Sequence, residues 1–497
     1  MISGLKNKSA GLDNIKASVV KCVKEEIVVP LSHLINSSMK TGIFPDAMKT
    51  AVVTPIYKNG AKNNITNYRP VSVLSAFSKL FERAMCNRLT NYLEKNNILD
   101  KHQYGFRKGH STDLAMVTVN DYILKALEDK DSVLAVYMDL SKAFDVLDHK
   151  ILLKKLLCYG IRGPAYDWIK SYLSNRKQVV KIDRSISAPL DIKYGVPQGS
   201  IMGPILFLLY INDICAASSL LSFVLFADDS NAFVRGKDVN NLICSVNTEL
   251  IKVTNWFKAN RLLLNIKKTH YMIFSHKNVV VNKEVTIGVD IIERVQCTTF
   301  LGVKIDEKLS WKNHIDHVNN KVSKCIGILY KLRHALTKRW LINLYNALIL
   351  PHLNYCNIVW GSVCPSVMSR LFITQKRALK IAMNLPRRTA TVHVFEMAKV
   401  IKVTDINKIH MAIFMFKYIQ GLLPSGFTNK FASSSQIHSY CIRDPLLFRL
   451  PVCRTQHFKT SAAYRGPYVW NNLPKEIKSV PNLFSLKKSI KQYFVSS

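Results

Sequence analysis

Acidic residues are scarce in this sequence. Its 497 residues include 33 Asp and Glu against 70 Lys and Arg, which gives a formal net charge of +37. Such an excess destabilises a folded chain by self-repulsion unless a polyanion neutralises it, so nucleic acid is the expected partner. Long apolar runs are missing too. The longest, such as 205–211 and 341–350, fall short of the roughly 20 residues that span a bilayer, and no membrane partner is expected.

Paired cysteines are also missing. The 11 cysteines are scattered through the chain, and no secretory signal opens it, so we expect reduced thiols in an intracellular protein. One group, His438, Cys441, Cys453 and His457, offers four zinc ligands but matches no finger spacing well. A zinc site there is therefore a minor alternative.

Two stretches instead concentrate carboxylates. The apolar run 133–138 ends in Asp139, and two apolar arms within 220–234 surround Asp228 and Asp229, which predicts a β-hairpin with the acid pair at its turn. A lone Asp-Asp pair is usually only a turn. Adjacent carboxylates raise each other's pKa unless a cation lies between them, so three converging acids would suit Mg²⁺. Two such ions could support an in-line phosphoryl displacement.

Between the acids lies a glycine-rich loop. Residues 194–204 read YGVPQGSIMGP and precede an apolar run, 205–214, that predicts a helix. Glycines at 195, 199 and 203 allow the backbone to approach a ligand closely, and the amide of Gln198 can hydrogen-bond a nucleotide or a template base.

With these segments the chain resembles the reverse transcriptases of LINE-type non-LTR retrotransposons, of the jockey-like group. The resemblance covers about 290 residues in one order. Its segments are 11–15 (GLDNI), 54–58 (TPIYK) with 67–72 (NYRPVS), 102–107 (HQYGFR) with 111–112, 139–145, 195–200, 226–229, 264–269 (LNIKKT) and 300–303 (FLGV).

The resemblance implies a role for each matching residue. Asp139 and Asp228 would be the principal metal ligands, with Asp229 and the backbone carbonyl of Leu140 as further oxygens for two Mg²⁺ ions, or Mn²⁺. Lys268 would act on the departing pyrophosphate. Four residues would bind the substrate nucleotide: Lys58 and Arg69 at the triphosphate, Phe144 excluding a 2′-hydroxyl, and Gln198 at the base.

Two positions depart from the family pattern, and some residues have plainer readings alone. Phe226 replaces the usual Tyr, which affects primer positioning but no carboxylate, and Asn14 replaces a Gly in the first segment. Taken singly, Lys268 is a solvated lysine, Phe144 a core aromatic and Arg69 a charge on an extended segment. Their place in the ordered series favours the functional roles.

The predicted fold is a multidomain α+β chain, a right-hand polymerase with a helical thumb. We expect a helical lead-in over 1–37, fingers and palm over 38–306, a basic helical thumb over 307–390 and a mainly helical C-terminal region over 391–497. The thumb stretch has fourteen Lys and Arg against only Glu307 and Asp316. Aromatics interleaved with basic residues from 454 to 474 could bind RNA or pack in a core, and both readings stay open.

The expected function is RNA-directed DNA synthesis. The partners would be an RNA template, a DNA primer and deoxynucleoside triphosphates, with the oligomeric state open. The family's N-terminal endonuclease is expected to be missing, and the place of action is expected to be the nucleus. The alternative is a decayed or domesticated relic that binds RNA without chemistry.

Overall fold

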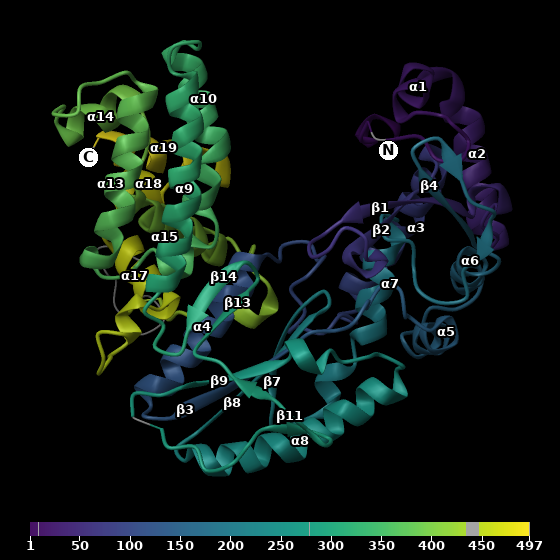
Figure 1. Cartoon of the computed structure of the whole chain (residues 1–497), viewed down its shortest axis with the longest axis horizontal. Coiled ribbons are helices and arrows are strands. Elements are labelled where there is room, and N and C mark those ends of the chain that lie inside the picture. Colours follow the sequence, from purple (N-terminus) through teal and green to yellow (C-terminus); the bar gives the residue numbers. More distant parts are fainter. Residues whose placement is uncertain (8, 278, 434–446, 497) are drawn as a thin grey trace.

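The computed structural model describes all residues except 8, 278, 434–446 and 497. His438 and Cys441, two of the four residues considered as zinc ligands, lie outside the described residues. Two lobes rise from a central sheet (Figure 1): one is built by the N-terminal part of the chain, and the other is helical and built by the C-terminal part. Within the described part of the chain, no helix is long and apolar enough to cross a membrane.

The central sheet, called the palm sheet here, has the strand order β12-β9-β3-β8-β7. Its strands are β3 (Ser132–Met138), β7 (Ser222–Phe226), β8 (Asp229–Gly236), β9 (His270–Phe274) and β12 (Glu293–Arg294). All seven residues of the central strand β3 are buried, as expected of an apolar strand covered on both faces. Alternate β3 residues join two separate cores, one containing α4 (Thr112–Glu128) and one containing α8 (Val239–Ala259). The strands predicted at 133–138 and 222–226 are confirmed.

The N-terminal lobe, where the sequence predicts the fingers, combines a small mixed sheet with helices. The sheet has the order β2-β1-β4-β5, with β6 also paired to β4. Its strands are β1 (Thr50–Tyr57), β2 (Tyr68–Val73), β4 (Lys177–Ile182), β5 (Ser185–Ile186) and β6 (Leu190–Asp191). The helices are α1 (Ala17–Cys22), α2 (Lys24–Thr41), α3 (Ala76–Lys95), α5 (His149–Cys158), α6 (Pro164–Leu173) and α7 (Met202–Ile211). The sequence pattern also predicts helices over 76–93 and 147–159, and these are confirmed as α3 and α5.

Helices form much of the lead-in predicted over 1–37, but only some of its apolar residues are buried. Val20 and Leu31 are buried, whereas Val19, Val23 and Val28 are exposed. The helical character predicted for this segment is confirmed from Ala17 onward, and its apolar residues are only partly buried. The second helix also runs past the predicted boundary, to Thr41, where Gly42 adopts φ 72° and ends it.

Helix α7 is the apolar run after the glycine-rich loop. It begins at Met202, three residues before the predicted start, and nine of its ten residues are buried. The buried carboxylate of Glu82 accepts hydrogen bonds from the backbone N–H groups of Ile201 (2.6 Å) and Met202 (3.2 Å). Burial raises the pKa of Glu82, although nearby Arg176 and these hydrogen bonds oppose the shift. Because the start of α7 is buried from water, Glu82 accepts the hydrogen bonds of N–H groups that would otherwise have no partner.

The C-terminal lobe is helical. Its helices are α9 (Lys312–Leu332), α10 (Lys338–Leu348), α11 (Leu350–Asn354), α12 (Asn357–Trp360), α13 (Pro365–Ala382), α14 (Thr391–Ala398), α15 (Val403–Ile419), α17 (Ala462–Asn471), α18 (Lys475–Lys478) and α19 (Leu483–Ser496). The hairpin of β13 (Cys297–Phe300) and β14 (Val303–Asp306) joins it to the palm, and β10 (Thr286–Ile287) pairs with β11 (Asp290–Ile291) nearby in the chain. Residues on both sides of position 390 share one core. The domain boundary at 390 stays a prediction.

The aromatic stretch after residue 454 belongs largely to this core. Phe458, Trp470 and Leu473 are buried, while Tyr468 is 43% exposed and stacks beside Tyr464. Core packing, one of the two readings left open by the sequence, therefore accounts for most of these aromatics.

The C-terminal region also docks on palm helix α4 through two acids. Glu128 accepts hydrogen bonds from the backbone N–H groups of Arg454 and Thr455, and the Arg454 guanidinium donates to the carbonyl of Glu128. Two helical turns earlier on α4, Asp121 accepts a hydrogen bond from the N–H of Ala462 (2.8 Å) and forms an ion pair with Lys430 (2.6 Å). Palm and C-terminal region are thus joined by hydrogen bonds as well as by apolar packing.

We predict that Asp121→Asn lowers the free energy of unfolding by about 3 kcal/mol, because the pair with Lys430 is nearly buried and the lysine would lose its partner. Chemical denaturation measures the change. Asp129→Asn is the matched control, since Asp129 forms exposed ion pairs with Lys125 and Arg235 and should cost less than about 1 kcal/mol. Equal losses of stability in the two variants would contradict a larger stabilising contribution from Asp121 than from Asp129.

Candidate active site

The β7–β8 hairpin is confirmed, with Asp228 in its turn and Asp229 as the first residue of β8. Phe226 pairs with Asp229, so Ala227 and Asp228 form the turn, and Ala227 has a left-handed φ of 55°. Strand β3 runs antiparallel to β8, with Met138 opposite Ser230. Asp139, the residue after β3, therefore reaches the same edge of the sheet as Asp228 and Asp229.

The three carboxylates repel one another there. Burial raises the pKa of Asp229 to about 6, with further contributions from the charges of Asp228 and Asp139. Burial also raises the pKa of Asp228, and the charge of Asp139 adds to the shift. Partial burial and mutual repulsion together make this edge a place where a cation would be stabilised.

Asp139 is held by the segment that follows α8. The side-chain amide of Asn265 donates to Asp139 Oδ2 (3.2 Å), and the backbone N–H of Asn265 donates to the Asp139 carbonyl (2.8 Å). The Thr269 hydroxyl accepts from the Asp139 N–H (3.4 Å). Lys268 places its Nζ 3.4 Å from Asp139 Oδ2, with its side chain 60% exposed. The structure thus brings Lys268 to the acids, and its role toward pyrophosphate stays a prediction.

Lys58 and Arg69 come from the β1–β2 hairpin. Arg69 lies opposite Ile56 in the pairing of the two strands, and the Lys58 N–H donates to the Asn67 carbonyl (2.9 Å). Both positive charges lower the pKa of Asp228, against the effect of burial. The fingers therefore face the acids with two exposed cations, the arrangement that a triphosphate between them would need.

The glycine-rich loop lies against the segment after Asp139. The Val196 N–H donates to the Phe144 carbonyl (2.9 Å), and a Cβ at Gly195, which has φ 77°, would lie 2.5 Å from the Asp145 carbonyl oxygen. The Gln198 amide donates to Asp145 Oδ1 (2.8 Å). In this structure Gln198 is therefore engaged with Asp145, and its contact with a base stays a prediction.

Phe144 is half-buried, and its ring lies 4.6 Å from that of Phe207 on α7. This contact fixes the ring from behind and is compatible with both a packing role and a sugar-facing role. Leu140, whose carbonyl was predicted as a metal ligand, is bridged to Leu264. Its coordination of a metal stays a prediction as well.

Gln103 is a site residue to which the sequence analysis assigned no role. It is 2% exposed, and its Oε1 accepts from the N–H groups of Gly105 (2.8 Å) and Ala227 (3.1 Å). Its chain segment also pairs with β7, since the Leu225 carbonyl and N–H bond the backbones of Tyr104 and His102. A Cβ at Gly105 would lie 2.4 Å from the nitrogen of Ala227. Gln103 and Gly105 together hold the turn that carries Asp228. Both lie in the segment 102–107 on which the family resemblance rests, and that was the available signal.

A divalent cation fits this donor set. Asp139, Asp228 and Asp229 provide carboxylate oxygens, the ligands that Mg²⁺ prefers. Burial, together with the charges of the neighbouring acids, raises the pKa values of Asp228 and Asp229, and a bound cation would favour their ionised forms.

Comparison with known proteins identifies the family. Residues 56–305, half of the chain, match the family described as reverse transcriptase (RNA-dependent DNA polymerase). The chain belongs to the reverse transcriptase family. All three acids and both fingers cations lie within the matched residues, as do Gln103 and the glycine-rich loop.

Two curated relatives come from Drosophila melanogaster. The chain is 28% identical over 403 residues to a probable RNA-directed DNA polymerase from transposon BS, covering 78% of this chain and 44% of that protein. It is 26% identical over 411 residues to the RNA-directed DNA polymerase from mobile element jockey, covering 80% and 44%. The chain thus spans less than half the length of these relatives.

Among solved structures, a telomerase from Candida albicans, in complex with a fragment of telomeric RNA, aligns with this chain. The alignment covers 76% of this chain and 66% of the telomerase chain. Its sequence identity is 11% and its TM-score 0.38, and we build no argument on this likeness.

We predict that Gln103→Leu weakens Mg²⁺ binding and lowers the rate of nucleotide incorporation by about 10-fold or more, because the turn that carries Asp228 loses its buried acceptor. Gln103→Glu keeps an oxygen in place and should retain more activity. Isothermal titration and single-turnover kinetics measure the two effects. Gln420→Leu, at an exposed position in the C-terminal lobe, is the control. Unchanged metal binding in a folded Gln103→Leu protein would refute a positioning role.

A second prediction concerns pH. Because a cation binds the ionised acids and the pKa of Asp229 is raised to about 6, affinity for Mg²⁺ should fall as the pH decreases through this value. Calorimetric titrations between about pH 5 and pH 8 should detect proton release on binding below neutrality. Asp229→Asn should remove this step of the pH profile and leave a weaker affinity. A flat wild-type profile would disagree with the raised pKa.

Proposed function

We propose that this chain extends the 3′-hydroxyl of a DNA primer along an RNA template, as the polymerase of a non-LTR retrotransposon. The observation that carries the proposal is the meeting of Asp139, Asp228 and Asp229 at one edge of the palm sheet, opposite the exposed cations Lys58 and Arg69. A group of carboxylates beside exposed positive charges suits a metal-bound triphosphate substrate, and the names of the relatives support the choice of template and product.

Asp139 and Asp228 would hold two Mg²⁺ ions, or Mn²⁺, with Asp229 as a supporting carboxylate and the Leu140 carbonyl as a further oxygen. Bound there, the ions would stabilise charge on the attacking and leaving oxygens. The protein's own contribution is positional: Asn265 and Thr269 orient Asp139, and Gln103 fixes the turn that carries Asp228.

The incoming deoxynucleotide would be bound from the fingers side. Lys58 and Arg69 would contact its phosphates, where the guanidinium offers a bidentate fork and the ammonium a point charge. Lys268, beside Asp139, is placed to neutralise the departing pyrophosphate. Phe144, backed by Phe207, would exclude a ribose 2′-hydroxyl.

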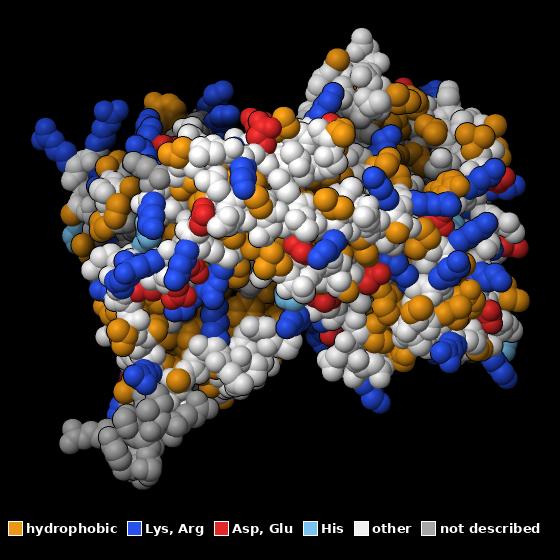
Figure 2. Space-filling model, turned by 90° about the horizontal axis from the view of Figure 1, so that it is seen from below, with side chains coloured by type: hydrophobic (Ala, Val, Ile, Leu, Met, Phe, Trp, Pro, Cys, Tyr) orange, Lys and Arg blue, Asp and Glu red, His pale blue; other side chains and the backbone are white. Residues whose placement is uncertain are grey.

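The helical lobe would hold the template–primer duplex. Lys321, Lys324 and Lys331 are exposed on α9. Lys and Arg side chains are also spread over the underside of the molecule, the face that Figure 2 shows, where Asp and Glu are fewer. Contacts of this kind bind phosphates and give affinity without choice of sequence. Such a surface fits the net charge of +37.

The decisive experiment is primer extension by the purified protein on poly(rA)/oligo(dT) with Mg²⁺. We expect activity in the wild type, and we expect Asp139→Asn or Asp228→Asn to reduce it to less than about a tenth while leaving binding of the template–primer nearly unchanged. Each substitution removes ligand charge but little volume. Template–primer binding without extension by the wild type would favour the alternative of a relic that binds RNA without chemistry.

The second test concerns sugar selection. Phe144→Val should admit ribonucleotides, because it opens space beside the sugar while leaving the acids in place. The ratio of the incorporation efficiencies for a ribonucleotide and the matching deoxynucleotide decides the outcome. Phe207→Leu alters the ring behind Phe144 and serves as a packing control. A ratio that Phe144→Val leaves unchanged would assign the ring to packing alone.

A further inference from the structure

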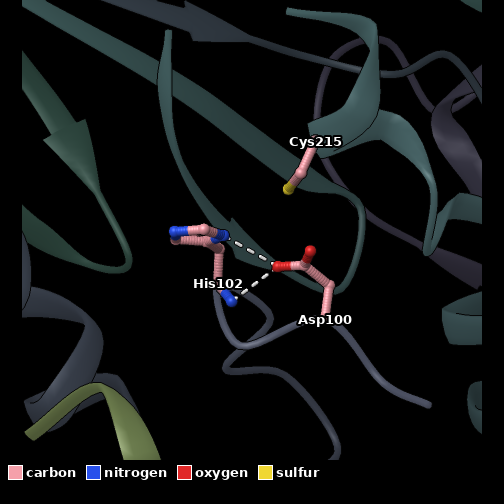
Figure 3. A group of neighbouring side chains, drawn as sticks. All are labelled: Asp100, His102 and Cys215. Atoms are coloured by element: carbon pink, nitrogen blue, oxygen red, sulfur yellow. Dashed lines mark hydrogen bonds and ion pairs between the residues drawn. The ribbon is translucent and has the colours of Figure 1, made fainter. Parts of the chain in front are cut away.

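A second group of metal-ligating side chains lies outside the active site. Asp100 and His102 belong to the loop between α3 and α4, and Cys215 belongs to the short 3₁₀ helix η4 (Ile214–Ala217) after α7. The three side chains point toward one another (Figure 3), and one ligand atom from each lies within 4.8 Å of the other two. All three residues are half-buried.

Contacts made by two other side chains, those of Asn212 and Arg107, bring these residues together. Asn212, just before η4, accepts from the Asp100 N–H (2.8 Å) and donates to the Ile98 carbonyl (2.8 Å). The Arg107 guanidinium donates to the Asp100 carbonyl (2.7 Å). The loop and η4 are therefore fixed to each other, and Cys215 is carried to the loop by that attachment.

Asp100 is the hub of the group. Its Oδ1 accepts from the His102 N–H (2.8 Å) and lies 2.8 Å from His102 Nδ1, and the Cys215 thiol also hydrogen-bonds the carboxylate. Nitrogen, oxygen and sulfur ligands are thus turned to a common point. If the cluster were purely structural, these hydrogen bonds would suffice and no metal ion would bind. Cobalt titration distinguishes the two possibilities.

We propose that Asp100, His102 and Cys215 form a binding site for a zinc-type transition-metal ion, with water as the fourth ligand. Sulfur and imidazole ligands favour Zn²⁺ over Mg²⁺, which prefers oxygen. Bonds of about 2.0 to 2.3 Å to a tetrahedral ion place its ligands roughly 3.3 to 3.8 Å apart. On metal binding, the 2.8 Å distance between Asp100 Oδ1 and His102 Nδ1 would lengthen slightly, and the larger distances between ligand atoms of the group would shorten.

The charges of the site balance. The ion would bind the carboxylate, the neutral imidazole through Nδ1 with its proton on Nε2, and the thiolate, so that one proton from the thiol is released to solvent for each ion bound. Two negative ligands then neutralise the divalent ion, in a chain that otherwise has an excess of positive charge.

The ion would fix a loop that leads to the active site. The residue after His102 is Gln103, which bonds the turn before Asp228, and the His102 carbonyl accepts from the Leu225 N–H on β7 (2.9 Å). Binding should therefore raise the melting temperature of the protein, because the folded state alone presents the three ligands together.

Cobalt titration of the metal-free protein tests the site. Co²⁺ bound to a thiolate gives a charge-transfer absorption in the near ultraviolet and strong ligand-field bands when it is four-coordinate. We expect one such ion per chain, displaced by Zn²⁺. Cys215→Ser should abolish the sulfur band, and His102→Gln should weaken affinity at least about 10-fold. Cys86→Ser, at a half-buried thiol that contacts Thr90, is the matched control and should change neither.

Two results would overturn the proposal: no sulfur band in the wild type, or a band that survives in Cys215→Ser. Circular dichroism of the metal-free variants establishes that they are folded, and Asp100→Asn with His102→Gln replaces Cys215→Ser should the latter not fold. Ions at the active-site acids have oxygen ligands and give no sulfur band. An Asp139→Asn protein should therefore keep the band, which separates this site from the polymerase function.

Discussion

The repulsion among Asp139, Asp228 and Asp229 is the constraint on which the rest of the site depends. Two of these acids have raised pKa values, because burial and neighbouring negative charge both disfavour ionisation. A fold that holds such charges together must fix them from outside, since their own interaction drives them apart. The palm sheet does so through backbone pairing, with β3 bonded on both sides by β8 and β9.

The surrounding polar contacts divide into two groups with different tasks. Asn265 and Thr269 bond Asp139 itself, and Gln103 bonds the turn before Asp228, so these residues position the acids. Lys58, Arg69 and Lys268 bring positive charge and remain exposed, so they are available to a ligand. Acids held in place beside exposed cations would suit the proposed triphosphate substrate, because positioning of the reacting groups lowers the entropic part of the barrier.

The sequence predicted the acids well because their signals are local. An apolar strand ending in Asp139 and two apolar arms around Asp228 and Asp229 determine both structure and position within a few residues. Gln103 could not be found in this way, because its partner Ala227 is 124 residues away and only the fold brings the two together. The partial burial of α1 and α2 could not be predicted for a related reason: helical spacing shows which residues share a face, but not whether another element covers it. The aromatic tail was ambiguous in composition, since buried and RNA-stacking rings are the same residue types.

The docking of the C-terminal region on α4 gives this tail a physical role in the placement of the helical lobe. Helix α4 packs against the palm strands and, through Glu128 and Asp121, bonds the segments around Arg454 and Lys430. Because the same core continues through α9, α13 and α15, a load on the helical lobe is transmitted to the palm through both apolar packing and these acids. A duplex bound by the basic helices would strain these attachments only if the palm and the helical lobe moved separately. The shared core resists such movement. The lobe's position relative to the three carboxylates therefore depends on residues far beyond the 56–305 segment that carries the family's signature.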